Sequence, residues 1–288
     1  MTVGVTGASG GVGSRVVRSL LDLEHDLDVV ALTRTPDAIP TLPHLAARYA
    51  NYEEPSSLRA SLSSVDTLIF ISSDGVAEPM LRHHAHVVSA SIEAGVRHIV
   101  YTSIVDVWPE STFYYASVHR ETEAMLAASG LSHALARTSI FADYFVSAWV
   151  GPALADGALR LPAASGRMSL VSRDDAARAL AVLALQRTAV TVELTGPAAL
   201  TVAEICHITQ VATGRELRYV ALDDASYRAR MARAHAPDWL IEAYSTMFES
   251  VRAGRFETVS ADIRELIGAP QQSFAAFIRT TPPVSSAN

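Results

Sequence analysis

VGVTGASGGVGSRVV, residues 3 to 17, joins a short β-branched run to a glycine-rich turn and a helix-like segment. Gly7, Gly10 and Gly13 follow the spacing G-x-x-G-x-x-G directly after this first expected strand. The first glycine permits a tight turn, the second lets the backbone approach a pyrophosphate, and the third lets helix and strand pack closely. The stretch therefore predicts a dinucleotide-binding loop that leads into a helix N-terminus.

The same alternation of short β-branched runs and longer helical segments continues through the first half of the chain. This pattern is typical of a parallel sheet with helices on both faces. We expect strands at 3–7, 28–34, 67–73, 98–103 and 133–139, a short strand within 48–54, and helices at 11–23, 41–48, 78–94 and 113–129. The predicted fold class is α/β, a Rossmann-type doubly wound parallel sheet with a smaller C-terminal substrate lobe.

The second half is less regular. Residues 156–185 read as strand, glycine turn, strand and helix, and residues 191–197 as one more strand. Thr201 and Glu204 form a capping-box pattern before an apolar helix that should stop at Gly214, and another helix follows Pro237. We divide the chain into a Rossmann domain (1–140), a mixed segment that completes the sheet and forms the smaller lobe (141–280), and a tail expected to be disordered (281–288).

Composition limits the chemistry. The chain has 288 residues, of which 49% are hydrophobic and 18% charged, so a large core can form. All 23 basic residues are arginine, which excludes a lysine Schiff base, a P-loop lysine and a Tyr-x-x-x-Lys pair. The single cysteine, Cys206, is expected to be a buried thiol, and we expect no metal site.

Charge and hydropathy limit the partners. The net charge is −7 and no basic run occurs, so neither nucleic acid nor an anionic membrane surface is expected as a partner. The first strand is expected to begin at residue 2 or 3, so we expect no leader, and no apolar run reaches membrane-spanning length. We expect a cytoplasmic protein with a small-molecule substrate, and a homodimer stays open.

The end of the second strand indicates which dinucleotide is bound. Proteins that bind NAD usually have an Asp or Glu there, which holds the ribose hydroxyls. This chain has Thr33 and Arg34 instead. An arginine would pair with a 2′-phosphate, and no carboxylate occupies the position to repel it. NADP(H) is therefore the predicted cofactor.

The segment FYYASVHRETE, residues 113 to 123, carries the candidate catalytic residues. Tyr115 and His119 are one helical turn apart, and Ser103 ends a strand that could bring it to the same site. The three could polarise a substrate oxygen and supply a proton after hydride transfer. Alternatively, His119 alone could donate a proton or hydrogen bond while Tyr115 only lines the pocket.

Other side chains are given simpler interpretations. We assign His83, His84 and His86 to a solvated helix face. We assign Asp174 and Asp175 to a helix start, where negative carboxylates interact favourably with the helix dipole. Four aromatic residues follow at near-helical spacing: Phe141, Tyr144, Phe145 and Trp149. We expect half of them in the core and one or two against a flat substrate.

Several motifs together resemble the NmrA-like, atypical short-chain dehydrogenase family, in particular its NADPH-dependent quinone oxidoreductases of type 2 and triphenylmethane reductases. They are VTGASGGVG, ALTRTP, LIFISS, AGVRHIVYTS, VHRETEAMLAASGLSHALAR, SIFADYF, TGPAALTVAEI and ELIGAP. The resemblance covers nearly the whole chain. It departs at Asn51, where the family more often has an aspartate, and in the aromatic-rich loop SIVDVWPESTFYY.

The resemblance implies a set of site residues. For the cofactor they are Thr6, Gly7, Ala8, Ser9, Gly10, Gly11, Val12, Gly13, Arg34, Ser72, Ser73, Thr102, Ser139, Ile140 and Phe141, and for the substrate Trp108, Tyr144 and Phe145. His119 falls where such reductases also carry histidine. The implied activity is hydride transfer from NADPH to a quinone or a similar flat conjugated acceptor. A ketone or enone reductase of secondary metabolism and a non-catalytic NADP(H)-sensing regulator stay open.

Overall fold

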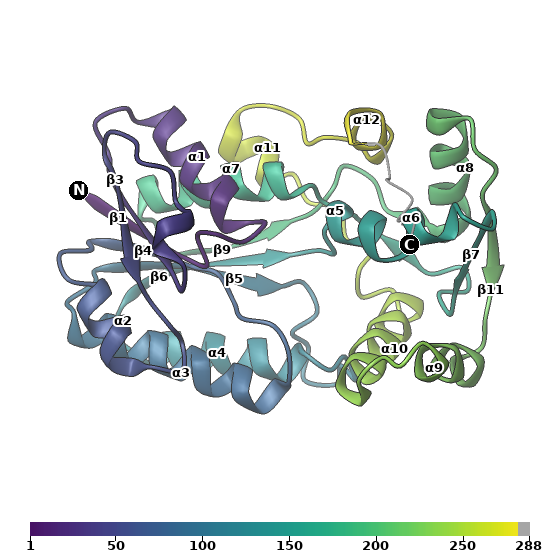
Figure 1. Ribbon diagram of the computed structural model, residues 1–288, viewed down its shortest axis with the longest axis horizontal. Helices are drawn as coiled ribbons and strands as arrows, with labels where there is room; N and C mark the ends of the chain where they lie inside the picture. Colours follow the sequence, from purple (N-terminus) through teal and green to yellow (C-terminus); the bar gives the residue numbers. More distant parts are fainter. Residues whose placement is uncertain (282–288) are drawn as a thin grey trace.

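A parallel sheet forms the centre of the larger part of the molecule, as the computed structural model shows for residues 1–281 (Figure 1). Its seven strands lie in the order β3-β2-β1-β4-β5-β6-β9, and every neighbouring pair is parallel. The strands are β1 (Thr2–Thr6), β2 (Asp28–Thr33), β3 (Leu45–Tyr49), β4 (Thr67–Phe70), β5 (His98–Ile104), β6 (Ser132–Thr138) and β9 (Val190–Leu194). The strand order reverses between β1 and β4, where doubly wound folds bind their ligands. The predicted fold class is confirmed.

Helices cover both faces of this sheet (Figure 1). On one face lie α1 (Gly13–Leu23), α7 (Arg173–Gln186) and α11 (Asp262–Ile267), and on the other α2 (Pro55–Ser61), α3 (Ala77–Glu93) and α4 (Ala116–Ala128). A separate apolar cluster fills each face. Because both faces are covered, inner strands such as β4 are buried at every residue.

The third strand lies earlier than predicted, and the predicted helix at 41–48 is wrong. Strand β3 spans Leu45–Tyr49, after a 3₁₀ turn at Pro36–Ala38, and pairs with β2 in the register Val29 to Leu45. It is an edge strand with largely exposed side chains, so its local sequence has no strand-like apolar alternation. Pairing with β2, a tertiary contact, determines its structure.

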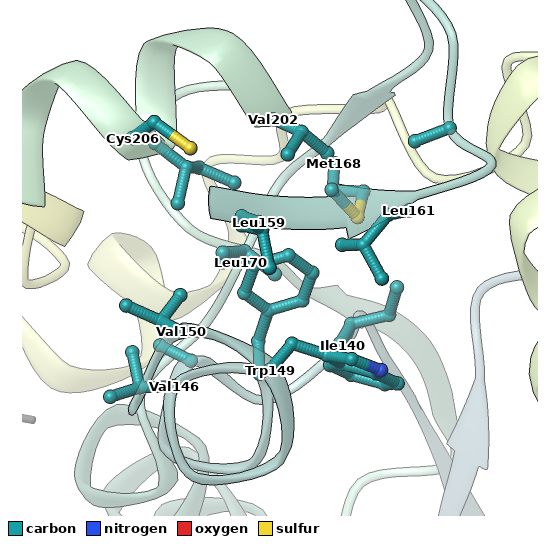
Figure 2. Packing of buried hydrophobic residues seen from close by; sticks show 14 of the residues in the cluster. Ile140, Val146, Trp149, Val150, Leu159, Leu161, Met168, Leu170, Val202 and Cys206 are labelled. Atoms are coloured by element: carbon teal, nitrogen blue, oxygen red, sulfur yellow. The ribbon is translucent and has the colours of Figure 1, made fainter. Parts of the chain in front are cut away.

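The smaller lobe follows β6 (Figure 1) and has its own apolar core (Figure 2). Its elements are α5 (Ala142–Phe145), a π-helical turn (Val146–Val150), α6 (Gly151–Ala153), β7 (Ala158–Leu161), β8 (Arg167–Met168), β10 (Leu200–Thr201), α8 (Val202–Thr213), β11 (Arg218–Ala221), α9 (Asp224–Arg233), α10 (Asp238–Arg252) and α12 (Phe274–Thr280). The thiol of Cys206 is buried in this core, as predicted.

Local signals located the helix ends of the lobe correctly. The Thr201 hydroxyl accepts a hydrogen bond from the Glu204 amide, and the Glu204 carboxylate accepts one from the Thr201 amide, so the predicted capping box forms. Helix α8 ends at Gly214, whose φ of 69° is in the left-handed region that favours glycine. Pro237 immediately precedes α10.

The described part of the chain is residues 1–281, and of the tail expected to be disordered only Thr281 belongs to it. Within this part, none of the helices combines the length and the apolar character that crossing a bilayer requires.

Candidate active site

A cavity of about 720 Å³ lies at the carboxyl ends of the central strands, between the sheet and the smaller lobe. Of the predicted site residues it is lined by Gly7, Ser9, Gly10, Val12, Arg34, Ser72, Ser73, Thr102, Ser103, Tyr115, His119, Ser139, Ile140, Phe141 and Tyr144. Thr6, Ala8, Gly11 and Gly13 are not among the lining residues and belong to the strand end and turn that shape the loop. Residues from five strand ends thus meet at one site.

The glycine loop has the geometry that a dinucleotide requires. Gly7 has a φ of +59°, and the Gly10 amide donates a 2.8 Å hydrogen bond to its carbonyl. A Cβ atom at position 13 would lie 2.2 Å from the same carbonyl oxygen, so only glycine fits there. Helix α1 starts at Gly13, and no side chain caps its first amides. A helix start of this kind favours an anionic ligand.

Hydroxyl groups and one exposed arginine lie at the end of β2. The Ser9 and Thr33 hydroxyls are 2.8 Å apart, and the Thr33 hydroxyl is 3.4 Å from that of Thr35. Arg34 is exposed at the cavity and forms no ion pair among residues 1–281. A cluster of hydroxyls beside a guanidinium fits the 2′-phosphate of NADP(H).

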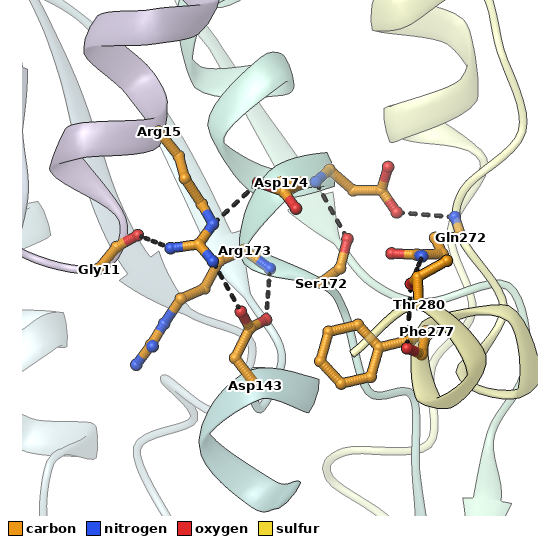
Figure 3. Close-up of polar contacts among 10 residues, drawn as sticks. Gly11, Arg15, Asp143, Ser172, Arg173, Asp174, Gln272, Phe277 and Thr280 are labelled. Carbon is orange, nitrogen blue, oxygen red and sulfur yellow. Dashed lines mark hydrogen bonds and ion pairs between the residues drawn. The ribbon is translucent and has the colours of Figure 1, made fainter. Parts of the chain in front are cut away.

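Arg173 is a cavity residue that the sequence analysis missed. A Cβ atom on Gly11 would meet its Nη1 at 2.9 Å, so the guanidinium lies directly over the glycine loop. Its Nε is buried and has no partner within residues 1–281, and Figure 3 shows the guanidinium outside the network of dashed contacts. The guanidinium carbon is 5.6 Å from the centre of the Phe141 ring. An arginine so placed could pair with a pyrophosphate.

The segment around Arg173 is tied to the glycine loop. Arg15 donates to the Gly11 carbonyl at 2.7 Å and pairs with Asp174 at 2.8 Å (Figure 3). Asp174 and Asp175 lie in the first turn of α7, as predicted, while the capping oxygen belongs to Ser172. The sequence signal for Arg173 was its position at the first residue of this helix.

Two backbone amides after β4 are fixed by buried side chains. The Ser72 amide donates to the Thr102 hydroxyl at 2.8 Å, and the Ser73 amide donates to Nε2 of His84 at 3.2 Å. His84 is fully buried. The prediction of a solvated face is therefore wrong for this histidine, because α3 packs this side against α4 and its Nδ1 lies 2.8 Å from the Thr122 hydroxyl.

His119, on α4, is 4% exposed and lines the cavity. Its Nδ1 lies 2.7 Å from the Tyr101 hydroxyl, and its Nε2 has no hydrogen-bonding partner among residues 1–281. Burial lowers the pKa of His119 to about 3. The side chain is therefore a neutral imidazole at physiological pH, and it can serve as a hydrogen-bond donor or acceptor.

Tyr115 and Ser103 also line the cavity, but the protons of their hydroxyls have partners in the protein. Tyr115 donates to the Gly75 carbonyl at 2.9 Å, and Ser103 donates to the Glu123 carboxylate at 2.6 Å. Burial raises the pKa of the Tyr115 phenol above its ordinary value. Of the three candidates that the sequence brought together, only His119 has an unpartnered polar atom within the described residues.

Half of the aromatic run lies in the core, as expected: Phe145 and Trp149 are buried in the lobe core, whereas Phe141 and Tyr144 line the cavity (Figure 2 labels Trp149). Two predicted substrate contacts are not found in the cavity. Phe145 is fully buried, and Trp108 is 58% exposed on a loop outside it.

Helix α10 supplies the opposite wall of the cavity. Its lining residues are Trp239, Leu240, Ala243, Tyr244 and Met247. They share one face of the helix. Such spacing in the sequence predicts an amphipathic helix, but it does not predict which part of the protein that face contacts. The docking of the lobe, a tertiary feature, places this face over the cavity, so the sequence analysis missed these residues.

Comparisons with known proteins show the family and support the fold. The family model described as "NmrA-like family" matches residues 1–272. Quinone oxidoreductase 2 of Escherichia coli is 28% identical over 280 residues, which cover 96% of this chain and 97% of that protein. The structure of an E. coli NADPH-dependent quinone oxidoreductase complexed with NADPH superposes with a TM-score of 0.87 at 27% identity, covering 96% of this chain and 99% of the other.

A Citrobacter sp. triphenylmethane reductase complexed with NADP(H) also superposes with a TM-score of 0.87, at 25% identity, covering 97% of this chain and 100% of the other. The fold and the glycine loop thus define a dinucleotide-binding protein of the Rossmann class. Within that class, the chain belongs to the NmrA-like family.

Proposed function

We propose that this NAD(P)H-dependent oxidoreductase uses NADPH to reduce a quinone or a similar flat, conjugated acceptor by hydride transfer. The observation that carries the proposal is the position of His119, a neutral imidazole with an unpartnered Nε2 within the described residues, in the cavity that contains the glycine loop. Relatives that share the fold and 25% to 28% of the sequence carry such activities in their names.

The cofactor end of the cavity supports NADP(H). The glycine loop and the start of α1 would receive the pyrophosphate, together with the guanidinium of Arg173. Arg34 and the hydroxyls of Ser9 and Thr33 would hold the 2′-phosphate. When bound, NADPH would supply the hydride, that is two electrons and one hydrogen nucleus, and would leave as NADP⁺.

The other end of the cavity suits a flat, conjugated acceptor. Tyr144 of α5 and Tyr244 of α10 face each other through their hydroxyls, and Trp239 and Phe113 line the same space. Aromatic walls favour a planar ring system. The α10 wall and its aromatic residues would hold the acceptor in place and exclude water.

His119 would donate a hydrogen bond from Nε2–H to the acceptor oxygen on which negative charge develops. Its lowered pKa argues against imidazolium as the proton source, so the product would take its proton from solvent once it leaves the cavity. A quinone accepts hydride readily, and binding it beside the cofactor can supply much of the catalysis. A ketone needs an acid, and the bond from Tyr115 to the Gly75 carbonyl argues against that role for the tyrosine.

The test is NADPH oxidation on mixing with a panel of quinones, conjugated dyes, enones and simple ketones. We expect turnover with quinones or dyes and little with simple ketones. Turnover restricted to ketones would contradict the proposal in favour of a ketone reductase. Tight NADPH binding with no turnover on any acceptor, together with a protein partner in a pull-down, would contradict it in favour of a regulator.

A further inference from the structure

A chain of buried polar contacts leads from the backbone to His119. The Ser73 amide donates to Nε2 of His84 at 3.2 Å. Nδ1 of His84 lies 2.8 Å from the Thr122 hydroxyl and 3.4 Å from that of Tyr101. The Tyr101 hydroxyl in turn lies 2.7 Å from Nδ1 of His119. These groups lie between α3, α4 and β5, and the three side chains His84, Tyr101 and Thr122 are fully buried.

The backbone amide determines which nitrogen of His84 carries the proton. An amide can only donate, so Nε2 of His84 must be an acceptor without a hydrogen. Burial and the nearby His119 lower the pKa of His84 to about 3, and a neutral imidazole carries one proton. That proton is therefore on Nδ1, where it points at the Thr122 hydroxyl. The Thr122 hydroxyl in turn donates a hydrogen bond to the Val118 carbonyl at 2.7 Å.

This assignment determines the direction of the Tyr101 hydroxyl. Its oxygen lies within hydrogen-bonding distance of two imidazole nitrogens, Nδ1 of His84 and Nδ1 of His119, and the Thr122 hydroxyl is a further polar neighbour. The first already carries a proton and cannot accept another hydrogen bond from the phenol. Of the two nitrogens only Nδ1 of His119, at 2.7 Å, can accept, so we assign the phenol proton to this contact. Burial raises the pKa of the Tyr101 phenol, so the proton stays on its oxygen.

We propose that Tyr101 is a positioning residue that fixes His119 as the Nε2–H tautomer and so directs a neutral hydrogen-bond donor at the acceptor oxygen. The Ser73 amide and His84 orient Tyr101 for this task. The inference rests on the proposed function, because it describes how His119 is prepared for that reaction. The catalytic contact belongs to His119, and Tyr101 acts through it.

The test reads the tautomer directly. The whole chain is labelled with ¹⁵N-histidine, and the His119 signals among the ten histidines are assigned by their absence in His119→Gln. In the wild type we expect the Nε2 of His119 to be protonated and its Nδ1 to be unprotonated and hydrogen-bonded. Neither nitrogen should titrate between pH 5 and pH 9, because this pH range lies about 2 units or more above the lowered pKa. A proton on Nδ1 of His119 would overturn the inference without reference to any variant.

Tyr101→Phe removes the donor at nearly constant shape, and Tyr227→Phe is the control, since Tyr227 is a buried tyrosine of the lobe outside the cavity. In Tyr101→Phe we expect Nδ1–H to become populated and kcat for quinone reduction to fall about tenfold, with KM within about twofold. An unchanged tautomer in a folded Tyr101→Phe would overturn the inference. The spectra need no turnover, so absent quinone reduction would refute the proposed function and leave the tautomer assignment to be judged separately.

Discussion

The hydroxyl of Tyr115 donates a 2.9 Å hydrogen bond to the carbonyl oxygen of Gly75. Tyr115 lines the cavity, where the tyrosine of a short-chain reductase would supply a proton. In this chain burial raises the pKa of the phenol, and its proton is directed at the backbone. We therefore propose that the tyrosine helps to shape the cavity and that the polar chemistry belongs to His119.

Tyr115→Phe is expected to keep kcat for quinone reduction within about threefold of the wild type, because general acid catalysis would contribute about a hundredfold or more and is not attributed to this residue. Steady-state turnover with NADPH and a quinone measures this kcat. Loss of the bond to Gly75 should appear as lower thermal stability. A hundredfold fall in kcat with unchanged stability would show that Tyr115 is the acid.

Arg34→Ala tests the choice of cofactor. Because a charge-assisted hydrogen bond contributes about 1.5–3 kcal/mol, NADPH should bind about ten to a hundred times more weakly while the affinity for NADH stays constant. Fluorescence titration of both dinucleotides measures this. Arg18→Ala, an exposed arginine on α1 outside the cavity, is the matched control. An equal loss of affinity for both dinucleotides would exclude a specific role at the 2′-phosphate.

In contrast to Arg34→Ala, Arg173→Ala should weaken the binding of NADPH and NADH equally. Because its guanidinium lies over Gly11, it should contact the pyrophosphate that both dinucleotides share. We expect NADPH and NADH to lose affinity by the same factor, about tenfold or more, so their ratio stays that of the wild type. Arg173→Lys should recover only part, because lysine lacks the planar fork. An altered NADPH to NADH ratio would place Arg173 elsewhere on the cofactor.

Acid should destabilise the fold through its buried histidines. In the folded state the pKa values of His84 and His119 are lowered to about 3, whereas in the unfolded chain they lie near the ordinary value of about 6.5. Between these limits the unfolded state binds more protons, so stability rises with pH and is lost as the pH falls below about 6.5. Each histidine contributes up to about 1.4 kcal/mol per pH unit.

Urea unfolding between pH 7 and pH 4.5 measures this slope. His119→Gln should reduce it by about one proton, that is about 1.4 kcal/mol per pH unit. A variant with the full wild-type slope would show that His119 is already protonated in the folded protein.

Local signals explain which features were predictable from the sequence. The glycine spacing at Gly7, Gly10 and Gly13 and the capping box at Thr201 depend on neighbours along the chain, and both appear as predicted. The third strand was predicted, but β3 begins earlier, within the residues assigned to a helix at 41–48, because pairing with β2 determines its position.

Tertiary packing explains the features that were not predictable. The burial of His84 follows from the packing of α3 against α4, and the wall of α10 follows from the docking of the lobe. Arg173 was missed because its partner, the turn at Gly11, is more than 160 residues away in the sequence. Neither helix period nor charge pattern contains this information.

His119→Ala, measured in steady-state reduction of a quinone by NADPH, tests the central claim most directly, with His133→Ala, a partly buried histidine of β6 outside the cavity, as control. Removing a hydrogen-bond donor that acts on developing charge should lower kcat by about tenfold or more. The affinity for NADPH should stay within about twofold of the wild type, because His119 is not assigned to the phosphates. Unchanged kcat and KM would contradict the account and make His119 a structural residue.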